Sequence, residues 1–116
     1  MRTYKISLIP GDGIGPEQTK ATIQVCERAK EAFGLGLEFI ETEAGDDCKR
    51  KHGSALPDET VRTLKTTDGC LKGPVGETAY DVIVTLRQMF DLYANLRPSR
   101  AYPGLSCLDP STDMII

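Results

Sequence analysis

The chain has 116 residues, of which 40% are hydrophobic and 27% are charged, and its formal net charge is -3. This composition is typical of a globular protein with an ordinary core, and no apolar run reaches the length of a membrane span. The acidic balance, with basic residues that do not cluster with aromatic ones, argues against a nucleic-acid partner. We therefore expect a cytoplasmic protein that binds neither nucleic acid nor a membrane.

The first half of the chain alternates between strand and helix patterns. Thr3 to Pro10 alternates and then becomes apolar, which predicts a strand entering a glycine-rich turn. Pro16 suits a first helical position, and apolar residues recur at helical spacing, so a helix is expected from Pro16 to Phe33. Leu37 to Thr42 predicts a second strand, whereas the polar, charged stretch Ala44 to Ala55 is expected to be a loop.

A second helix and a third strand are expected in the middle of the chain. The helix should begin at Pro57 and end before Gly69, because glycine just beyond the last periodic residue is a common helix stop. A short strand, Cys70 to Lys72, should follow. Strands that alternate with helices in this way indicate an α/β domain with a largely parallel sheet.

A third helix and two further strands are expected toward the end. Thr78 and Asp81 form a Thr-x-x-Asp capping-box pattern ahead of a helix that should reach about Phe90 or Leu92. Tyr93 to Arg97 is expected to be a strand that ends at Pro98, and an apolar strand should begin near Met114 to Ile116.

Cysteine usage favours free thiols. Cys26, Cys48, Cys70 and Cys107 contain no CxxC pair, and His52 is the only histidine that could join them as a metal ligand. Scattered cysteines are typical of proteins in a reducing compartment. The sequence therefore predicts four free thiols and assigns no metal ligand in this chain.

The glycines Gly11, Gly13 and Gly15 stand between a predicted strand and a predicted helix, where dinucleotide-binding proteins carry GxGxxG. The spacing does not fit, because the third glycine would have to stand at Pro16. Taken alone, the pattern favours a plain tight turn.

Several short motifs nevertheless occur in a specific order along nearly the whole chain. They are Gly11–Glu17 (GDGIGPE), Glu43–Asp46 (EAGD), Ala55–Pro57 (ALP), Leu71–Pro74 (LKGP), Leu86–Arg87 (LR) and Asp91–Pro98 (DLYANLRP). This combination resembles the isocitrate, isopropylmalate and homoisocitrate dehydrogenase family, and most of all its archaeal isopropylmalate branch.

The resemblance implies an α/β, doubly wound isopropylmalate-dehydrogenase-like fold, of which this chain would be the amino-terminal fragment. Residues 1–100 would belong to the large domain, and residues 101–116 would begin a second, smaller domain. The complete protein would be a homo-oligomer that oxidises and decarboxylates a 3-substituted malate, with NAD or NADP and with Mg²⁺ or Mn²⁺. The branch implies 3-isopropylmalate as substrate, in leucine biosynthesis. Homoisocitrate or isocitrate dehydrogenase, or a noncatalytic regulatory fragment, are the alternatives.

The resemblance also assigns substrate residues. Arg87 and Arg97 match the first two arginines that hold the substrate carboxylates. Ile83 and Val84 precede Arg87 by four and three residues, with Tyr80 one turn earlier, so one helix face could present apolar groups beside a carboxylate clamp.

Three positions on that helix bear on the choice of substrate. Isocitrate-specific relatives carry serine and asparagine where Asp81 and Ile83 stand, and homoisocitrate-specific relatives tend to carry arginine at Val84. The helix therefore favours an isopropyl group. Ile83 and Val84 could instead be ordinary core residues, since β-branched residues are often buried.

The remaining assigned residues would border the nicotinamide and its ribose. They are Ile14, Gly73, Pro74, Val75, Gly76 and Thr78. A simple turn followed by a helix cap at Thr78 is an equal alternative. The family's catalytic residues and metal ligands have no match in this chain, so no catalytic residue or metal ligand is assigned, and the 116-residue chain alone is expected to be inactive.

Overall fold

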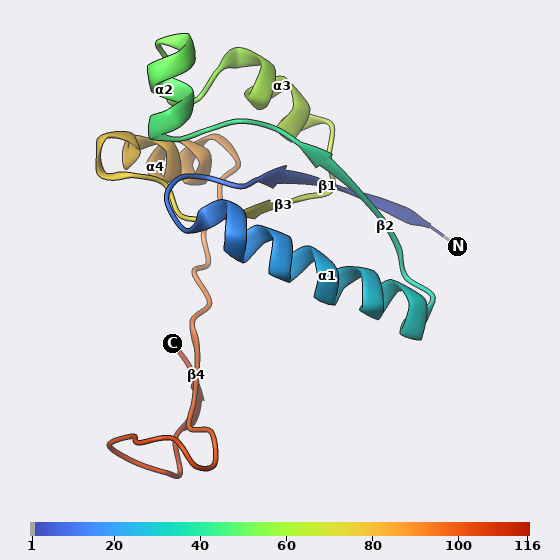
Figure 1. Cartoon of the computed structure of the whole chain (residues 1–116), viewed down its shortest axis with the longest axis vertical. Coiled ribbons are helices and arrows are strands. Elements are labelled where there is room, and N and C mark those ends of the chain that lie inside the picture. Colours follow the sequence, from blue (N-terminus) through green and yellow to red (C-terminus); the bar gives the residue numbers. More distant parts are fainter. Residues whose placement is uncertain (1) are drawn as a thin grey trace. The chain divides into compact units, whose positions relative to one another are not determined.

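A three-stranded parallel sheet organises the first part of the chain in the computed structural model, which describes residues 2–116. Strand β1 (Thr3–Ile9) lies between β2 (Gly36–Glu41) and β3 (Gly69–Lys72). All pairs run parallel, and Ile6 of β1 pairs with Phe39 on one side and with Gly69 on the other (Figure 1). The predicted α/β class with a parallel sheet is therefore confirmed.

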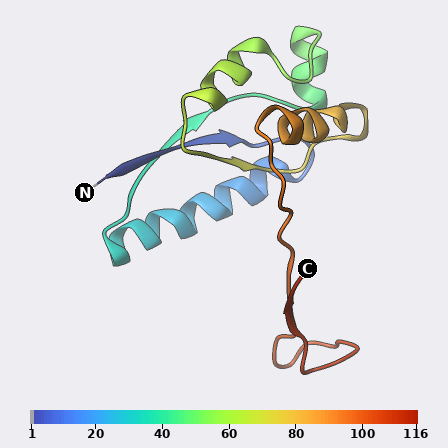
Figure 2. The same ribbon diagram turned by 180° about the vertical axis from the view of Figure 1, so that it is seen from behind.

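Helices lie on both faces of this sheet. Helix α1 (Gly15–Phe33) covers one face, while α2 (Asp46–His52) and α3 (Asp58–Lys65) lie on the opposite side (Figures 1 and 2). A short 3-10 helix, η1 (Glu77–Ala79), precedes α4 (Asp81–Met89). No helix of residues 2–116 is both long enough and apolar enough to span a bilayer.

The ends of α1 follow the local sequence signals. Proline stands in its first turn, where the missing N–H costs no hydrogen bond, and Glu17 adds a negative charge at the positive end of the helix dipole. Gly34 ends the helix in the left-handed region, with φ 63°, and its N–H donates to the carbonyl of Lys30. The predicted bounds of α1 and β3 agree to within one residue, whereas α3 ends at Lys65, three residues earlier than predicted.

Among the strands, the core lies at the carboxyl end of β1. Along β1 only Ser7, Leu8 and Ile9 are buried, whereas the first residues of the strand are exposed. The fully buried Ser7 hydroxyl shares a 2.7 Å hydrogen bond with the Thr67 hydroxyl, which offsets the cost of removing it from water.

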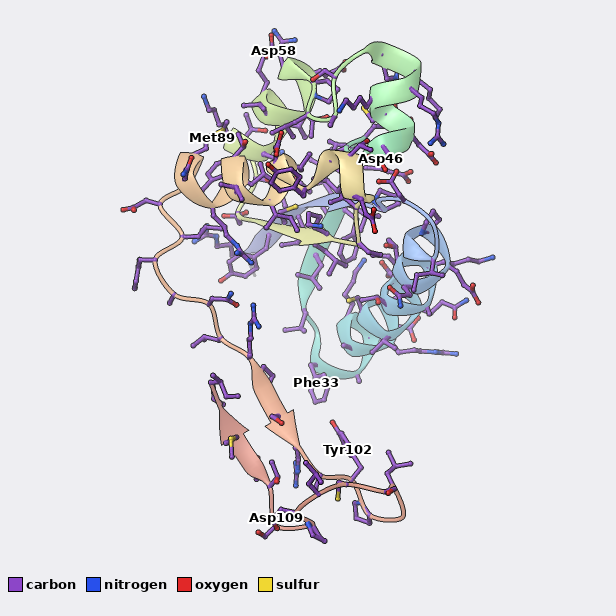
Figure 3. All side chains as sticks on the ribbon, turned by 90° about the vertical axis from the view of Figure 1, so that its left-hand side faces the viewer. Phe33, Asp46, Asp58, Met89, Tyr102 and Asp109 are labelled. Carbon is purple, nitrogen blue, oxygen red and sulfur yellow. The ribbon has the colours of Figure 1, made fainter. Side chains whose placement is uncertain are left out.

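The loop prediction for Ala44 to Ala55 is wrong, because α2 forms within it. Helix α2 lacks an apolar stripe, and Cys48 is its one buried residue. Its charges complement the helix dipole instead, with acidic residues in the first turn and basic ones in the last. Gly53, with φ 77°, terminates it, and Figure 3 labels Asp46 at its start.

The capping box predicted at Thr78 is also wrong. Thr78 lies inside η1, and α4 begins only at Asp81. The Thr78 hydroxyl donates to the carboxylate of Asp46, which is distant in sequence, whereas in a capping box it would accept a hydrogen bond from the N–H of Asp81.

The chain divides into two compact units, one ending at Val84 and the other comprising Thr85–Ile116, so that α4 contains the boundary. The second unit contains an antiparallel pair, β4 (Pro98–Arg100) and β5 (Asp113–Ile115). Side chains between these strands, such as Tyr102, are exposed (Figure 3). A domain boundary near residue 100 stays a prediction.

The strand predicted at Tyr93 to Arg97 is not formed, and β4 begins at Pro98, the residue expected to end it. Proline is compatible with the first residue of a strand because it needs no N–H there. The final apolar strand is confirmed as β5, which pairs with β4.

Helix α4 ends through a residue that adopts an unusual conformation. Asp91 has φ 49°, the only positive φ of a non-glycine residue in the described part of the chain. The Leu92 N–H donates to the carbonyl of Arg87, and the Asp91 N–H donates to that of Gln88. This is the Schellman pattern, in which glycine is the preferred residue and aspartate is tolerated.

We expect Asp91→Gly to raise the free energy of unfolding by about 0.5 kcal/mol, and Asp91→Val to lower it by about 1–2 kcal/mol, because a β-branched side chain disfavours positive φ. Asp91→Asn, which also removes the charge, serves as the control and should change little. Thermal or urea denaturation measures all three. Equal effects of glycine and valine would contradict the prediction.

Candidate functional site

The three loops that follow β1, β2 and β3 lie at one edge of the sheet. Because the strands are parallel, their carboxyl ends point the same way, and in doubly wound proteins ligands bind outside this edge. The loops comprise residues 10–14, 42–45 and 73–76. This edge is therefore the candidate functional site of the first unit.

The carboxylate of Asp12 joins the loop after β1 to the start of α2 and to the loop after β3. It accepts hydrogen bonds from the backbone N–H groups of Asp46 at 2.7 Å, Asp47 at 2.9 Å and Gly76 at 2.7 Å. The Asp12 N–H in turn donates to the carbonyl of Pro74 at 2.8 Å. The same side chain thus satisfies the first N–H groups of α2 and fixes the segment after β3.

These hydrogen bonds favour the charged form of Asp12. Partial burial acts in the opposite direction, by disfavouring a charge away from water, but the N–H donors of Asp47, Gly76 and Asp46 outweigh it, helped by the charge of Arg50. The pKa of Asp12 is lowered as a result.

Glycine is required at this edge because two backbone segments approach each other closely. A Cβ on Gly11, which has φ 77°, would lie 1.9 Å from the carbonyl oxygen of Pro74. A Cβ on Gly73 would lie 2.1 Å from the carbonyl oxygen of Pro10. The turn after β1 and the segment after β3 therefore touch through their backbones. This contact alone explains why glycine stands at these positions, and a bound pyrophosphate is not needed to account for it.

The structure brings the predicted nicotinamide residues to this edge. Ile14 belongs to the turn that Asp12 anchors, and its side chain is 62% exposed. The segment from Gly73 to Gly76 lies against that turn, and Thr78 follows in η1, where its carbonyl also accepts a hydrogen bond from Lys49 at 3.1 Å. The exposed, apolar side chain of Ile14 therefore belongs to a turn that packs against the backbone of residues 73–76.

Most of the predicted substrate residues lie on α4 or directly before it. Val82 and Leu86 form its buried stripe, whereas Tyr80, Val84 and Arg87, at spacings of four and three, are exposed. Val84 is 45% exposed, and Ile83 is half-buried. Asp81, at the start of the helix, is exposed.

Arg97 lies in the second unit, immediately before β4. Its backbone N–H donates to the carbonyl of Ile116 at 2.8 Å, and the Ile116 N–H donates back at 3.0 Å. Pairing with β5 therefore fixes the backbone of Arg97, whereas its side chain is exposed.

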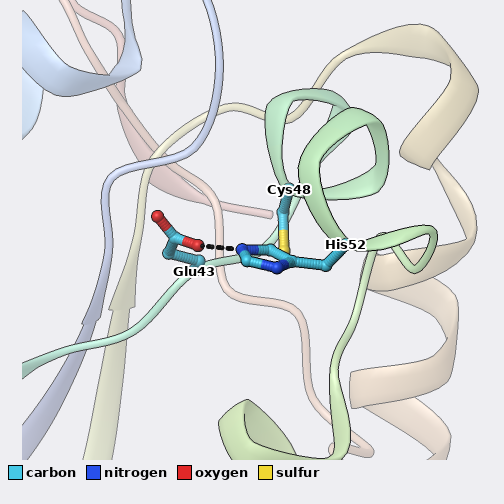
Figure 4. A group of neighbouring side chains, drawn as sticks. All are labelled: Glu43, Cys48 and His52. Carbon is cyan, nitrogen blue, oxygen red and sulfur yellow. Dashed lines mark hydrogen bonds and ion pairs between the residues drawn. The ribbon is translucent and has the colours of Figure 1, made fainter.

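Sequence reasoning missed one cluster, formed by Glu43, Cys48 and His52 (Figure 4). The Glu43 carboxylate is 2.9 Å from His52 Nε2, and one ligand atom of each residue lies within 4.8 Å of the other two. The missed signal was the spacing of four between Cys48 and His52, which places both on one helix face only if the segment is helical.

Hydrogen bonds from His52 and Lys51 lower the pKa of Glu43. Burial, and then the charges of Glu43 and Asp12, raise the pKa of the Cys48 thiol. A raised pKa disfavours the thiolate, which is the nucleophilic form of cysteine. All four cysteines are free, as predicted.

The sequence matches the family described as isocitrate/isopropylmalate dehydrogenase over residues 5–116. It is 51% identical to the 3-isopropylmalate/3-methylmalate dehydrogenase of Methanocaldococcus jannaschii, across 97% of this chain and 33% of that protein. It is 45% identical to the 3-isopropylmalate dehydrogenase of Saccharolobus solfataricus, across 98% of this chain and 34% of that protein.

Solved structures give the same family. The crystal structure of isocitrate dehydrogenase from Methylococcus capsulatus superimposes with a TM-score of 0.85 at 35% identity, across 97% of this chain and 33% of that chain. The chain therefore spans about a third of the length of the relatives it matches.

We expect Asp12→Asn to lower the free energy of unfolding by about 1.5–3 kcal/mol at neutral pH, because a charged acceptor of several N–H groups is lost. A lowered folded-state pKa adds stability that is present above the unfolded pKa, near 4, and is lost as the pH falls through the folded value. The difference between wild type and variant should therefore shrink below about pH 4.

Denaturation curves between pH 2 and pH 7 measure this difference. Glu38→Gln, which neutralises an exposed carboxylate on β2, is the control and should have little effect. A difference that stays constant down to pH 2 would show that the charge of Asp12 is not what the three N–H groups require.

Proposed function

This chain belongs to the isocitrate/isopropylmalate dehydrogenase family, and we propose that it forms part of an NAD(P)-dependent, decarboxylating 3-isopropylmalate dehydrogenase of leucine biosynthesis. The observation that carries the proposal is the exposed face of α4, which has Val84 and Arg87 three residues apart within a family match over residues 5–116. An apolar group beside a guanidinium suits a substrate with an isopropyl group next to carboxylates.

In this proposal the arginines bind and orient the substrate. The guanidinium groups of Arg87 and Arg97 would each hold a carboxylate through paired hydrogen bonds, which a planar, permanently charged fork forms better than an ammonium group. Val84 and the half-buried Ile83 would contact the isopropyl group, Tyr80 would extend that surface by one turn, and Asp81 would lie at its edge.

The cofactor proposal rests on the edge anchored by Asp12. The exposed Ile14 side chain would border the nicotinamide, and Gly73, Pro74, Val75 and Gly76, with Thr78, would line its ribose. When bound, the nicotinamide would accept a hydride from the substrate alcohol, and Mg²⁺ or Mn²⁺ would polarise the resulting ketone for loss of carbon dioxide. The Glu43 cluster contains a thiol, which these oxygen-preferring ions do not favour, so no ligand for them is proposed in this chain.

Isocitrate is the second candidate substrate, because an isocitrate dehydrogenase superimposes well. The aliphatic Ile83 and Val84 argue against it, since neither can hydrogen-bond a further carboxylate. A homo-oligomer in the cytoplasm is proposed for the complete enzyme. A noncatalytic role would be supported if the complete protein bound 3-isopropylmalate without reducing NAD or NADP.

The role of Arg97 is tested by Arg97→Lys in the complete enzyme. The charge is kept while the two-pronged contact is lost, so kcat/KM for 3-isopropylmalate should fall at least about tenfold, or roughly 1.4 kcal/mol of transition-state stabilisation. Arg100→Lys, three residues further on in β4, is the matched control and should be nearly silent. Wild-type kinetics in Arg97→Lys would remove Arg97 from the site.

The substrate preference is tested by Val84→Arg. A long cation should displace apolar contacts with the isopropyl group and offer a partner to the distal carboxylate of homoisocitrate. Since a hydrophobic pocket discriminates by only about 1–3 kcal/mol per methylene-sized change, the kcat/KM ratio of the two substrates should shift rather than invert completely. Val25→Arg, on an exposed position of α1, is the control. An unchanged ratio would mean that Val84 does not contact the substrate.

A further inference from the structure

We propose that Glu43, Cys48 and His52 form a binding site for a divalent transition-metal ion of the Zn²⁺ type, separate from any metal of the dehydrogenase reaction. Cys48 and His52 are four residues apart in α2, which places their side chains on one face of the helix. Glu43 precedes the helix and reaches His52 Nε2 at 2.9 Å (Figure 4).

The distances suit a metal after small side-chain adjustments, in which Glu43 and His52, now 2.9 Å apart, would separate slightly. One ligand atom from each residue lies within 4.8 Å of the others. Zinc bonds of about 2.0–2.3 Å in tetrahedral geometry require ligand atoms about 3.3–3.8 Å apart. Cys48 is held in place by burial, with 3% of its surface exposed, whereas the Glu43 and His52 side chains are each 54% exposed and can move inward.

The ligand types select the class of ion. A thiolate sulfur, an imidazole nitrogen and a carboxylate oxygen together match Zn²⁺ or Co²⁺, whereas Mg²⁺ and Mn²⁺ prefer oxygen alone. Three protein ligands leave a fourth position open for water. Glu43 and Cys48 both line a pocket of about 620 Å³, which gives that position room.

Lys51 is the competing cation. Its Nζ lies 3.4 Å from the Glu43 carboxylate, so Lys51 must give up or share that carboxylate when a metal binds. If the cluster binds a metal, removing the charge of Lys51 should strengthen metal binding. If the cluster is only a set of ion pairs with Glu43, removing the same charge should weaken it. The effect of Lys51 therefore separates the two explanations.

The test is a Co²⁺ titration of the purified chain, followed by the near-ultraviolet absorbance that arises when a thiolate binds the ion. We expect one equivalent of Co²⁺ to bind, Zn²⁺ to displace it, and excess Mg²⁺ to leave it in place. His52→Gln and Glu43→Gln should each weaken binding at least tenfold, and Cys48→Ser should abolish the absorbance. Lys51→Gln should tighten binding severalfold.

The controls are Cys70→Ser and Cys107→Ser, which remove exposed thiols outside the cluster and should leave the titration unchanged. If Cys48→Ser does not fold, His52→Gln decides the matter, because the His52 side chain is mostly exposed. Absence of the absorbance in wild type, its persistence in Cys48→Ser, or unchanged affinity in His52→Gln would each overturn the proposal. None of these readouts depends on dehydrogenase activity.

Discussion

The carboxylate of Asp12 is the interaction on which the carboxyl edge of the sheet depends. It accepts hydrogen bonds from the N–H groups of Asp46, at the start of α2, and of Gly76, which lie 34 and 64 residues further along the chain. Loop closure over such separations costs conformational entropy, so a charged acceptor with several donors is an effective way to hold the loops together. The glycines at positions 11 and 73 let the backbones approach closely enough for these bonds to form.

Elements specified by local signals were predictable from the sequence. Pro16 and Gly34 mark the two ends of α1, and the strands of the parallel sheet show as short apolar runs between helices. Helix α2 was not predictable in this way, because it has no apolar periodicity and its first N–H groups are satisfied by Asp12. Without α2, the spacing of Cys48 and His52 carried no meaning, so the cluster with Glu43 was missed.

The errors near the end of the chain have the same origin. Strand β4 is defined by its pairing with β5, and local propensity placed a strand a few residues too early, at 93–97. The resemblance of the short motifs to those of the dehydrogenase family was more informative about the site than the hydrophobic periodicity was. It singled out Ile14 and residues 73–76, which the structure brings to one edge, and Val84 and Arg87, which are exposed on α4. Their roles remain proposals.

A seven-residue helix is too short to be stable alone, so α2 depends on contacts beyond itself. Asp12 stabilises its first turn, and a metal held by Cys48 and His52 would stabilise the following turns. Asp12 and the metal would both favour the helical conformation of α2. By thermodynamic linkage, each would strengthen the other's interaction with the helix by the same free energy. Metal binding would therefore favour the helical conformation in which the first N–H groups of α2 meet Asp12. A bound metal would thus add a second contact to a helix whose first turn Asp12 caps and which is too short to be stable without such contacts.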